Sequence, residues 1–205
     1  MEKKNYELFC LVAKVQLVDK TEIYVTSIIA IIIFFVFNEL LFLIALIYFG
    51  IYFREEKNLF KTDKIIKSII SFTLFIPLLF LISFIIQYVL PEYKQQEIVL
   101  NFKSTLIEDK GILLHVLILA PVVEEVIFRG YIYRILKSKL PIIFSMIISS
   151  TLFALIHYNV LSYILLFVLS IFLTYIYERN GSIICPIIIH SLFNLMMSIL
   201  IIFGN

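Results

Sequence analysis

Long runs of apolar residues, separated by short polar stretches, fill most of the chain. A membrane-spanning helix needs about 20 apolar residues, and backbone groups in hydrocarbon must be hydrogen-bonded within their own segment. The pattern therefore predicts an all-α, polytopic membrane helical bundle with about six transmembrane helices. The runs lie at Ile23–Phe53, about Ile65–Leu90, from Gly111 onward, Pro141–Tyr158, Leu161–Tyr177 and Ile183–Phe203.

The first run leaves the count at six or seven. It is too long for one upright helix and short for two, so it is either one long tilted helix or a tight pair. Before it, the patch "LFCLVAKVQLV" is interrupted by Lys14 and is predicted to be an amphipathic segment at the membrane interface. We expect two parts: residues 1–110, with this segment and the first spans, and residues 111–205, a four-helix membrane core.

Basic residues in the connections predict the orientation. The loops Arg54–Lys64 and Arg129–Leu140 carry four Lys or Arg each, the connection Pro91–Lys110 carries three, and the turn after Tyr158 carries none. Because cytoplasmic loops are enriched in Lys and Arg, the first two loops, with Arg179, are predicted to be cytoplasmic. The piece "YIYRILKSKL" (residues 131–140) is predicted to lie at the membrane surface.

Composition and net charge limit the kinds of molecule that the protein can bind. Hydrophobic residues make up 62% of the chain and the net charge is +2, so no basic face is concentrated enough for nucleic acid. Cys10 and Cys185 are far apart and form no C-x-x-C pattern, which argues against a disulfide framework or a metal knuckle. The expected surroundings are a lipid bilayer: a bacterial plasma membrane, with plastid or endoplasmic-reticulum membranes as alternatives.

Three charged residues interrupt the third run, in "PVVEEVIFRG" (residues 121–130). A charge at mid-span costs about 2.5–3.5 kcal/mol on insertion scales. Glu125 and Arg129 are four apart, so they share a helix face and are predicted to pair as structural support. Glu124 points about 100° away and needs a cavity, a water or another span. Ionisable residues within spans usually mark function, although a structural ion pair with a Glu at the membrane edge is the alternative.

The remaining spans offer few polar partners for Glu124. His157 ends the fourth run, while His190 and Asn194 share one face of the sixth. We expect these three side chains to converge on Glu124. His115 lies nine residues before Glu124, half a turn out of phase, and is left out of the site.

The motifs "EEVIFR", "FALIH" and "HSLFN" match E-E-x-x-x-R, F-x-x-x-H and H-x-x-x-N, in that order and on three separate spans. In this they resemble the CPBP family (CAAX proteases and bacteriocin-processing enzymes, also called Abi), which includes the Ras-converting CAAX endopeptidase. The resemblance covers about residues 120–205. It implies intramembrane hydrolysis of a peptide or protein substrate within or near the membrane, and makes the 111–205 core catalytic.

The roles that the resemblance implies agree with residue chemistry. A desolvated carboxylate is a better base near neutral pH, so Glu124 is expected to be the general base, with His157 helping to orient or deprotonate the water. His190 and Asn194 would stabilise the oxyanion. No cofactor is favoured, but zinc is possible, because Glu124, His157 and His190 could make a three-ligand catalytic set. The spacing lacks a local zinc motif such as H-E-x-x-H, which favours the glutamic over the metallo type.

Two other functions remain open from the sequence. One is a non-enzymatic or regulatory membrane protein, such as a bacteriocin self-immunity factor built on the same scaffold. The other is a small transporter or proton relay, since buried Glu and His also suit proton transfer. Paired broken helices in inverted repeats would favour transport, and the sequence has none.

Overall fold

The computed structural model describes residues 60–89, 104–105, 111–157 and 160–203. The chain divides into two units between Ile44 and Ala45, and every described residue belongs to the second. The run Ile23–Phe53, the interfacial segment and most of the connection Pro91–Lys110 lie outside the described residues. The division of the chain at residue 110 therefore stays a prediction.

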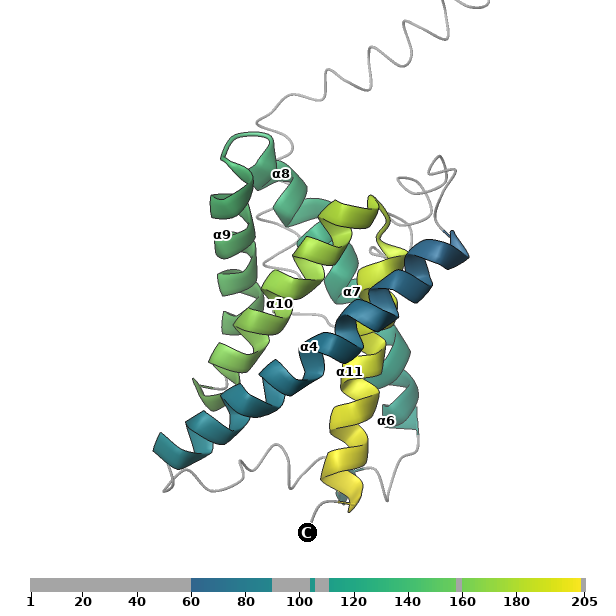
Figure 1. Ribbon diagram of the computed structural model, residues 1–205, viewed down its shortest axis with the longest axis vertical. Coiled ribbons are helices and arrows are strands. Elements are labelled where there is room, and N and C mark those ends of the chain that lie inside the picture. Colours follow the sequence, from purple (N-terminus) through teal and green to yellow (C-terminus); the bar gives the residue numbers. More distant parts are fainter. Residues whose placement is uncertain (1–59, 90–103, 106–110, 158–159, 204–205) are drawn as a thin grey trace, which may run out of the picture. The chain divides into compact units, whose positions relative to one another are not determined.

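All elements described are helices (Figure 1). One helix, α4 (Thr62–Val89), corresponds to the second predicted span. The third span is one continuous helix with alternating α- and π-helical segments: α6 (Gly111–Leu114), η1 (His115–Leu119), α7 (Ala120–Glu125), η2 (Val126–Tyr133) and α8 (Arg134–Lys137). Three more helices follow: α9 (Ile142–Leu155), α10 (Val160–Asn180) and α11 (Ile184–Phe203). The all-α membrane bundle is thus confirmed.

The prediction that residues 131–140 lie at the membrane surface is wrong for most of this segment. The third span continues through it to Lys137, and Tyr133 is completely buried. Its amphipathic pattern arises because the apolar side of the helix faces α10 and α11, where Tyr133 packs with Tyr177, Ile183, Ile184 and Ile187. The basic residues mark the end of the span.

The fourth run is shorter than predicted. The helix α9 has 14 residues, or about 21 Å at 1.5 Å per residue, which is less than the roughly 30 Å of hydrocarbon. It begins after Pro141 and ends before His157. A full span would have placed His157 at the far membrane surface, whereas this short helix ends within the bundle.

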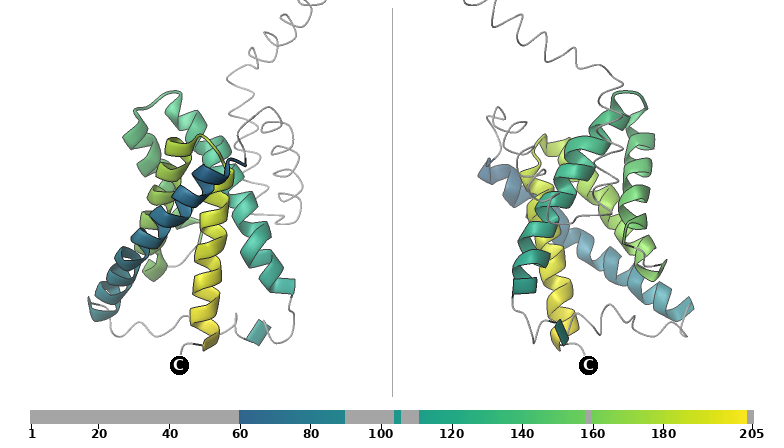
Figure 2. Two further views of the ribbon diagram at one scale, coloured as in Figure 1. Left: turned by 45° about the vertical axis from the view of Figure 1, so that its right-hand side comes forward. Right: turned by 180° about the vertical axis from the view of Figure 1, so that it is seen from behind.

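Packing joins α4 to the C-terminal helices. A second apolar cluster combines Phe72 and Leu79 of α4 with Leu169 and Leu173 of α10 and with Ile189 and Phe193 of α11. Figure 1 shows α4 crossing α10 and α11, and α9 lying beside α10. Figure 2 shows the third span beside α11. His190 follows Ile189 directly on α11, so the candidate site adjoins this core.

The outward faces are apolar too. Large side chains such as Leu74 (77% exposed), Phe84 (67%) and Ile143 (69%) have no protein cover among the described residues. Four helices in this part of the chain are long and apolar enough to cross a membrane: α4, the third span, α10 and α11. Hydroxyls within them bond back to the preceding turn, as Ser68 does to Lys64 and Ser198 to Asn194, so that they need no water.

Candidate active site

Glu124 and Glu125 are the last two residues of α7, and their carboxylates lie beside different atoms. Glu125 is fully buried, and its Oε1 accepts a hydrogen bond from Arg129 Nη1 at 2.8 Å. The predicted pair is thus present, one turn apart as the spacing required. The same Oε1 also accepts a hydrogen bond from His190 Nδ1 at 2.9 Å. Glu125 therefore joins the third span to α11 as well as bracing its own helix.

Arg129 continues the chain of contacts to α10. Its Nη2 donates to Ser170 Oγ at 2.7 Å and to the Ser170 carbonyl at 3.0 Å. Its guanidinium lies 4.8 Å from the centroid of the Phe153 ring, a cation–π contact. Both Arg129 and Ser170 are fully buried. Ser170 could not be predicted from the sequence, because a serine in an apolar span usually bonds within its own helix.

Glu124 faces both histidines. Its Oε2 lies 3.7 Å from His190 Nε2 and 3.9 Å from His157 Nε2. These distances are too long for direct hydrogen bonds. The same Oε2 is buried and has no hydrogen-bond partner among the described residues. Two of the three side chains predicted to converge on Glu124, those of His157 and His190, thus lie beside it. The third, Asn194, bonds instead to the Val116 carbonyl.

The hydrogen bonds at the Nδ1 atoms fix the tautomers of the two histidine rings. His157 Nδ1 lies 2.8 Å from the Phe153 carbonyl, and His190 Nδ1 lies 2.9 Å from Glu125 Oε1. Both partners can only accept, so each Nδ1 carries a hydrogen. Each Nε2 then faces Glu124, with a lone pair when the ring is neutral and a hydrogen when it is charged.

Phe153 holds the two rings in place. Its ring centroid is 5.0 Å from that of His157 and 5.7 Å from that of His190, the latter nearly edge-on. Phe153 is fully buried. This explains why a phenylalanine stands four residues before the histidine in "FALIH": it fills the space between α9 and α11 and fixes the separation of the rings.

Asn194 is anchored by the irregular helix. Ala120 N–H bonds to the carbonyl of His115, five residues back. In that register the next donor would be residue 121, bonding to the Val116 carbonyl, but Pro121 has no N–H. Asn194 Nδ2 donates to that carbonyl at 2.9 Å. One amide hydrogen is thereby used, and the second is left for another acceptor.

Five candidate residues are therefore brought together from three elements: Glu124, Glu125 and Arg129 from the third span, His157 after α9, and His190 from α11. Asn194 lies one turn after His190 on α11 and contacts the third span at Val116. His157 and Glu124 have side chains 29% and 17% exposed, while that of His190 is 4% exposed. The site thus has an open edge at Glu124 and His157 and a closed back at Glu125 and Arg129.

Imidazole nitrogens and a carboxylate are ligands that zinc takes in catalytic sites. However, no three His, Cys, Asp or Glu side chains in the described ranges are arranged to hold a metal ion as they stand. No step is therefore derived through a metal.

Residues 109–196 match the family described as "Type II CAAX prenyl endopeptidase Rce1-like". A stretch of 79 residues is 37% identical to "UPF0177 protein YxdF" of Lactococcus lactis subsp. lactis (strain IL1403), covering 38% of this chain and 43% of that relative. The chain thus matches less than half the length of this curated relative. No solved structure matches the chain.

These matches confirm the resemblance to CAAX-type proteases of the CPBP family over the part of the chain that carries all six site residues. The family is one of intramembrane endopeptidases. The family match and the four helices of spanning length together identify the chain as a multi-pass integral membrane protein.

Proposed function

We propose that the protein is an intramembrane endopeptidase that hydrolyses peptide bonds with a water activated by Glu124 and His157, without a metal. The observation that carries this proposal is the Glu124 Oε2 atom, which is buried, unpartnered among the described residues and flanked by two imidazole Nε2 atoms. A carboxylate kept free of direct partners at such a point is a base with room for the water that it deprotonates.

The two histidines have different proposed roles in catalysis. His157 lies at the open edge, where its Nε2 and the Glu124 carboxylate can both hydrogen-bond to one water placed beside them. His190 has its Nδ1–H on Glu125, so protonation at Nε2 makes it a donor that the Glu125 carboxylate stabilises. His190 Nε2–H and the free Asn194 amide hydrogen then donate to the oxyanion of the tetrahedral intermediate.

The substrate is proposed to be a peptide or protein segment that reaches the site from the bilayer or its surface. Whether it is prenylated is a matter for assay. The alternative, a non-enzymatic immunity or regulatory protein, has no need for Glu124 to remain unpaired beside two histidines.

The test is a peptidase assay on the purified protein in detergent or lipid, with a library of prenylated and unmodified peptides. Glu124→Gln keeps the shape but cannot accept a proton, so its rate should fall about a hundredfold to ten-thousandfold. It should be as well folded as the native protein, because insertion improves when a carboxylate is removed. Asp63→Asn, at an exposed carboxylate of α4, is the matched control and should be fully active.

Treatment with a zinc chelator distinguishes the metal-free mechanism from a zinc mechanism. Activity should persist after prolonged treatment with a zinc chelator. Activity that disappears with the chelator and returns with zinc would contradict the metal-free mechanism and make Glu124, His157 and His190 ligands. Full activity in Glu124→Gln would contradict both versions.

A further inference from the structure

Hydrolysis inside a hydrophobic bundle requires a supply of water, and a set of buried polar atoms suggests how it arrives. Four buried side-chain atoms have no hydrogen-bond partner in the described part of the chain: Glu124 Oε2, Glu125 Oε2, Arg129 Nε and Ser150 Oγ. A fifth buried polar atom, Tyr133 Oη, interacts with the Glu178 carboxylate. Buried polar groups are nearly always hydrogen-bonded, to ordered water where no protein group serves. Four unpartnered atoms in one helix bundle indicate bound water.

Three of these side chains share one face of the third span, because Glu125, Arg129 and Tyr133 are spaced four apart on it. On α9, the Ser149 hydroxyl bonds to the Phe128 carbonyl at 3.3 Å. Ser150, next in sequence, therefore lies within about one helical turn of Phe128 and Arg129. This row of atoms contains two carboxylate acceptors, one guanidinium donor and two hydroxyls that can do both, so water can bond to every member.

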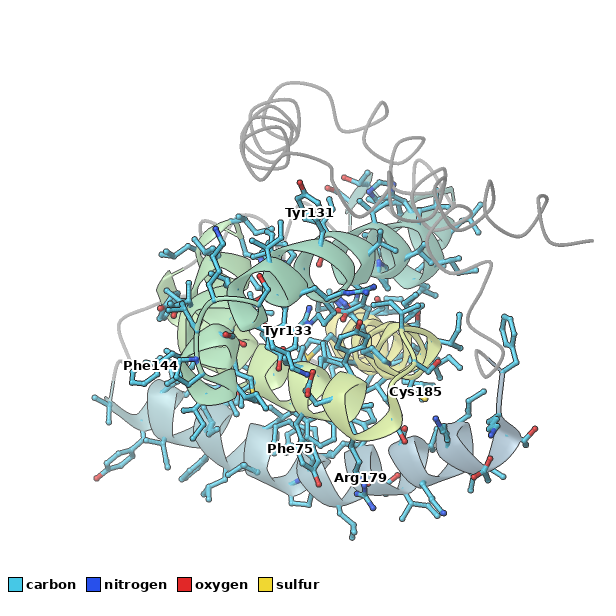
Figure 3. The ribbon with its side chains drawn as sticks, turned by 90° about the horizontal axis from the view of Figure 1, so that it is seen from above. Phe75, Tyr131, Tyr133, Phe144, Arg179 and Cys185 are labelled. Atoms are coloured by element: carbon cyan, nitrogen blue, oxygen red, sulfur yellow. The ribbon has the colours of Figure 1, made fainter. Side chains whose placement is uncertain are left out.

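The row ends at a polar opening. Tyr133 packs edge-on against Tyr177, with ring centroids 6.2 Å apart, and its hydroxyl lies near the Glu178 carboxylate. Tyr177 and Glu178 line an open cavity of about 500 Å³ together with Arg134, Lys137, Ser138 and Gly181. Figure 3 shows Tyr133 in the interior of the bundle, whereas Tyr131 on the same span points away from it. The other end of the row is Glu124.

We infer that these atoms bind a file of water molecules that leads from the cavity at Lys137 and Glu178 to Glu124 and replaces the one water consumed with each bond cleaved. The purpose given to this file rests on the proposed function, but its occupancy by water does not. Hydrolysis uses the oxygen and both hydrogens of that water in the acid and amine products, so the file needs to carry water alone.

Radiolytic hydroxyl-radical footprinting of the purified full chain tests the inference, because radicals formed from a bound water oxidise the side chain beside it. Tyr133 is 0% exposed and should nevertheless be oxidised. Phe72, 4% exposed in the apolar cluster with α10 and α11, is the control and should be protected, with an oxidation rate about tenfold lower because apolar interiors are dry. Equal protection of Tyr133 and Phe72 would overturn the inference.

Two serines of α9 make a matched pair. Ser150→Ala removes an unpartnered hydroxyl from the row and should lower the oxidation of Tyr133 severalfold. Ser145→Ala removes an equally buried hydroxyl that already bonds to the Pro141 carbonyl, and should leave it unchanged. Equal effects of both substitutions would overturn the assignment of Ser150. Tyr133 should also be oxidised in Glu124→Gln, so the result stands or fails independently of peptidase activity.

Discussion

At the scale of single residues, the His190 imidazole is the point where the two glutamates meet. Its Nδ1 contacts Glu125 and its Nε2 faces Glu124. The sequence predicted that the two carboxylates point apart and that Glu125 pairs with Arg129, since both follow from helix geometry. It did not predict that Glu125 also holds His190, because that contact joins residues 65 positions apart and depends on how α11 packs.

Arg129 should be the most stabilising charged residue of the site. Arg129→Ala leaves Glu125 buried without its counter-ion, which should cost about 3–5 kcal/mol of unfolding free energy. It should also lower the peptidase rate, because Glu125 then orients His190 less firmly. Thermal unfolding in detergent and the peptidase assay measure the two effects.

The control for Arg129 is Lys137, whose ion pair with Glu178 at 2.6 Å is partly exposed. Lys137→Ala should cost no more than about 1 kcal/mol, the usual value for exposed pairs. An Arg129→Ala protein as stable and active as Lys137→Ala would show that the buried pair neither braces the helix nor positions His190.

At the scale of elements, irregular helices position the site, and these were the least predictable part of the fold. The apolar runs predicted where α4, α10 and α11 lie within a few residues. Hydropathy gives no sign of a π-helical turn, which changes the hydrogen-bond register and not the composition. Nor did it show that the run Pro141–Tyr158 contains a helix of only 14 residues, which is what brings His157 to the depth of His190.

Pro121 should affect catalysis because it leaves the Val116 carbonyl without a backbone donor. Pro121→Ala supplies an N–H that can bond to Val116 and displace Asn194 from it. The helix should be at least as stable, because the donor missing at proline is restored. The peptidase rate should fall towards that of Asn194→Ala, about a hundredfold to a thousandfold for the loss of an oxyanion donor. Unfolding temperature and rate are measured together.

Pro77, an exposed proline inside α4, provides the matched comparison. Pro77→Ala repairs a helix away from the site and should leave the rate unchanged. If Pro121→Ala were also fully active, the contact between Asn194 and Val116 would have no part in catalysis.

At the scale of the whole molecule, charge is divided between one end of the bundle and its centre. Lys64 Nζ donates to the Asn180 carbonyl, and Lys137 pairs with Glu178. Both contacts lie in the last turn of α10, where helix carbonyls attract cations. The start of α4 and the end of the third span are therefore on the same side. The predicted loop Arg129–Leu140 is helical as far as Lys137 and buries Arg129, so only its last residues connect two helices. The water file inferred above opens on this side too.

This common end is predicted to face the cytoplasm, because basic residues collect there. Single cysteines at Lys61 and Ser138, in a chain without Cys10 and Cys185, should resist an impermeant thiol reagent on intact cells and react after permeabilisation. A cysteine at Gln95, in the less basic connection Pro91–Lys110, should react on intact cells and serves as the positive control. The three positions test one orientation, since Lys61 and Ser138 must behave alike if α4 and the third span start and end as described. Labelling of both in intact cells, with Gln95 protected, would reverse the orientation and make the file draw its water from outside the cell.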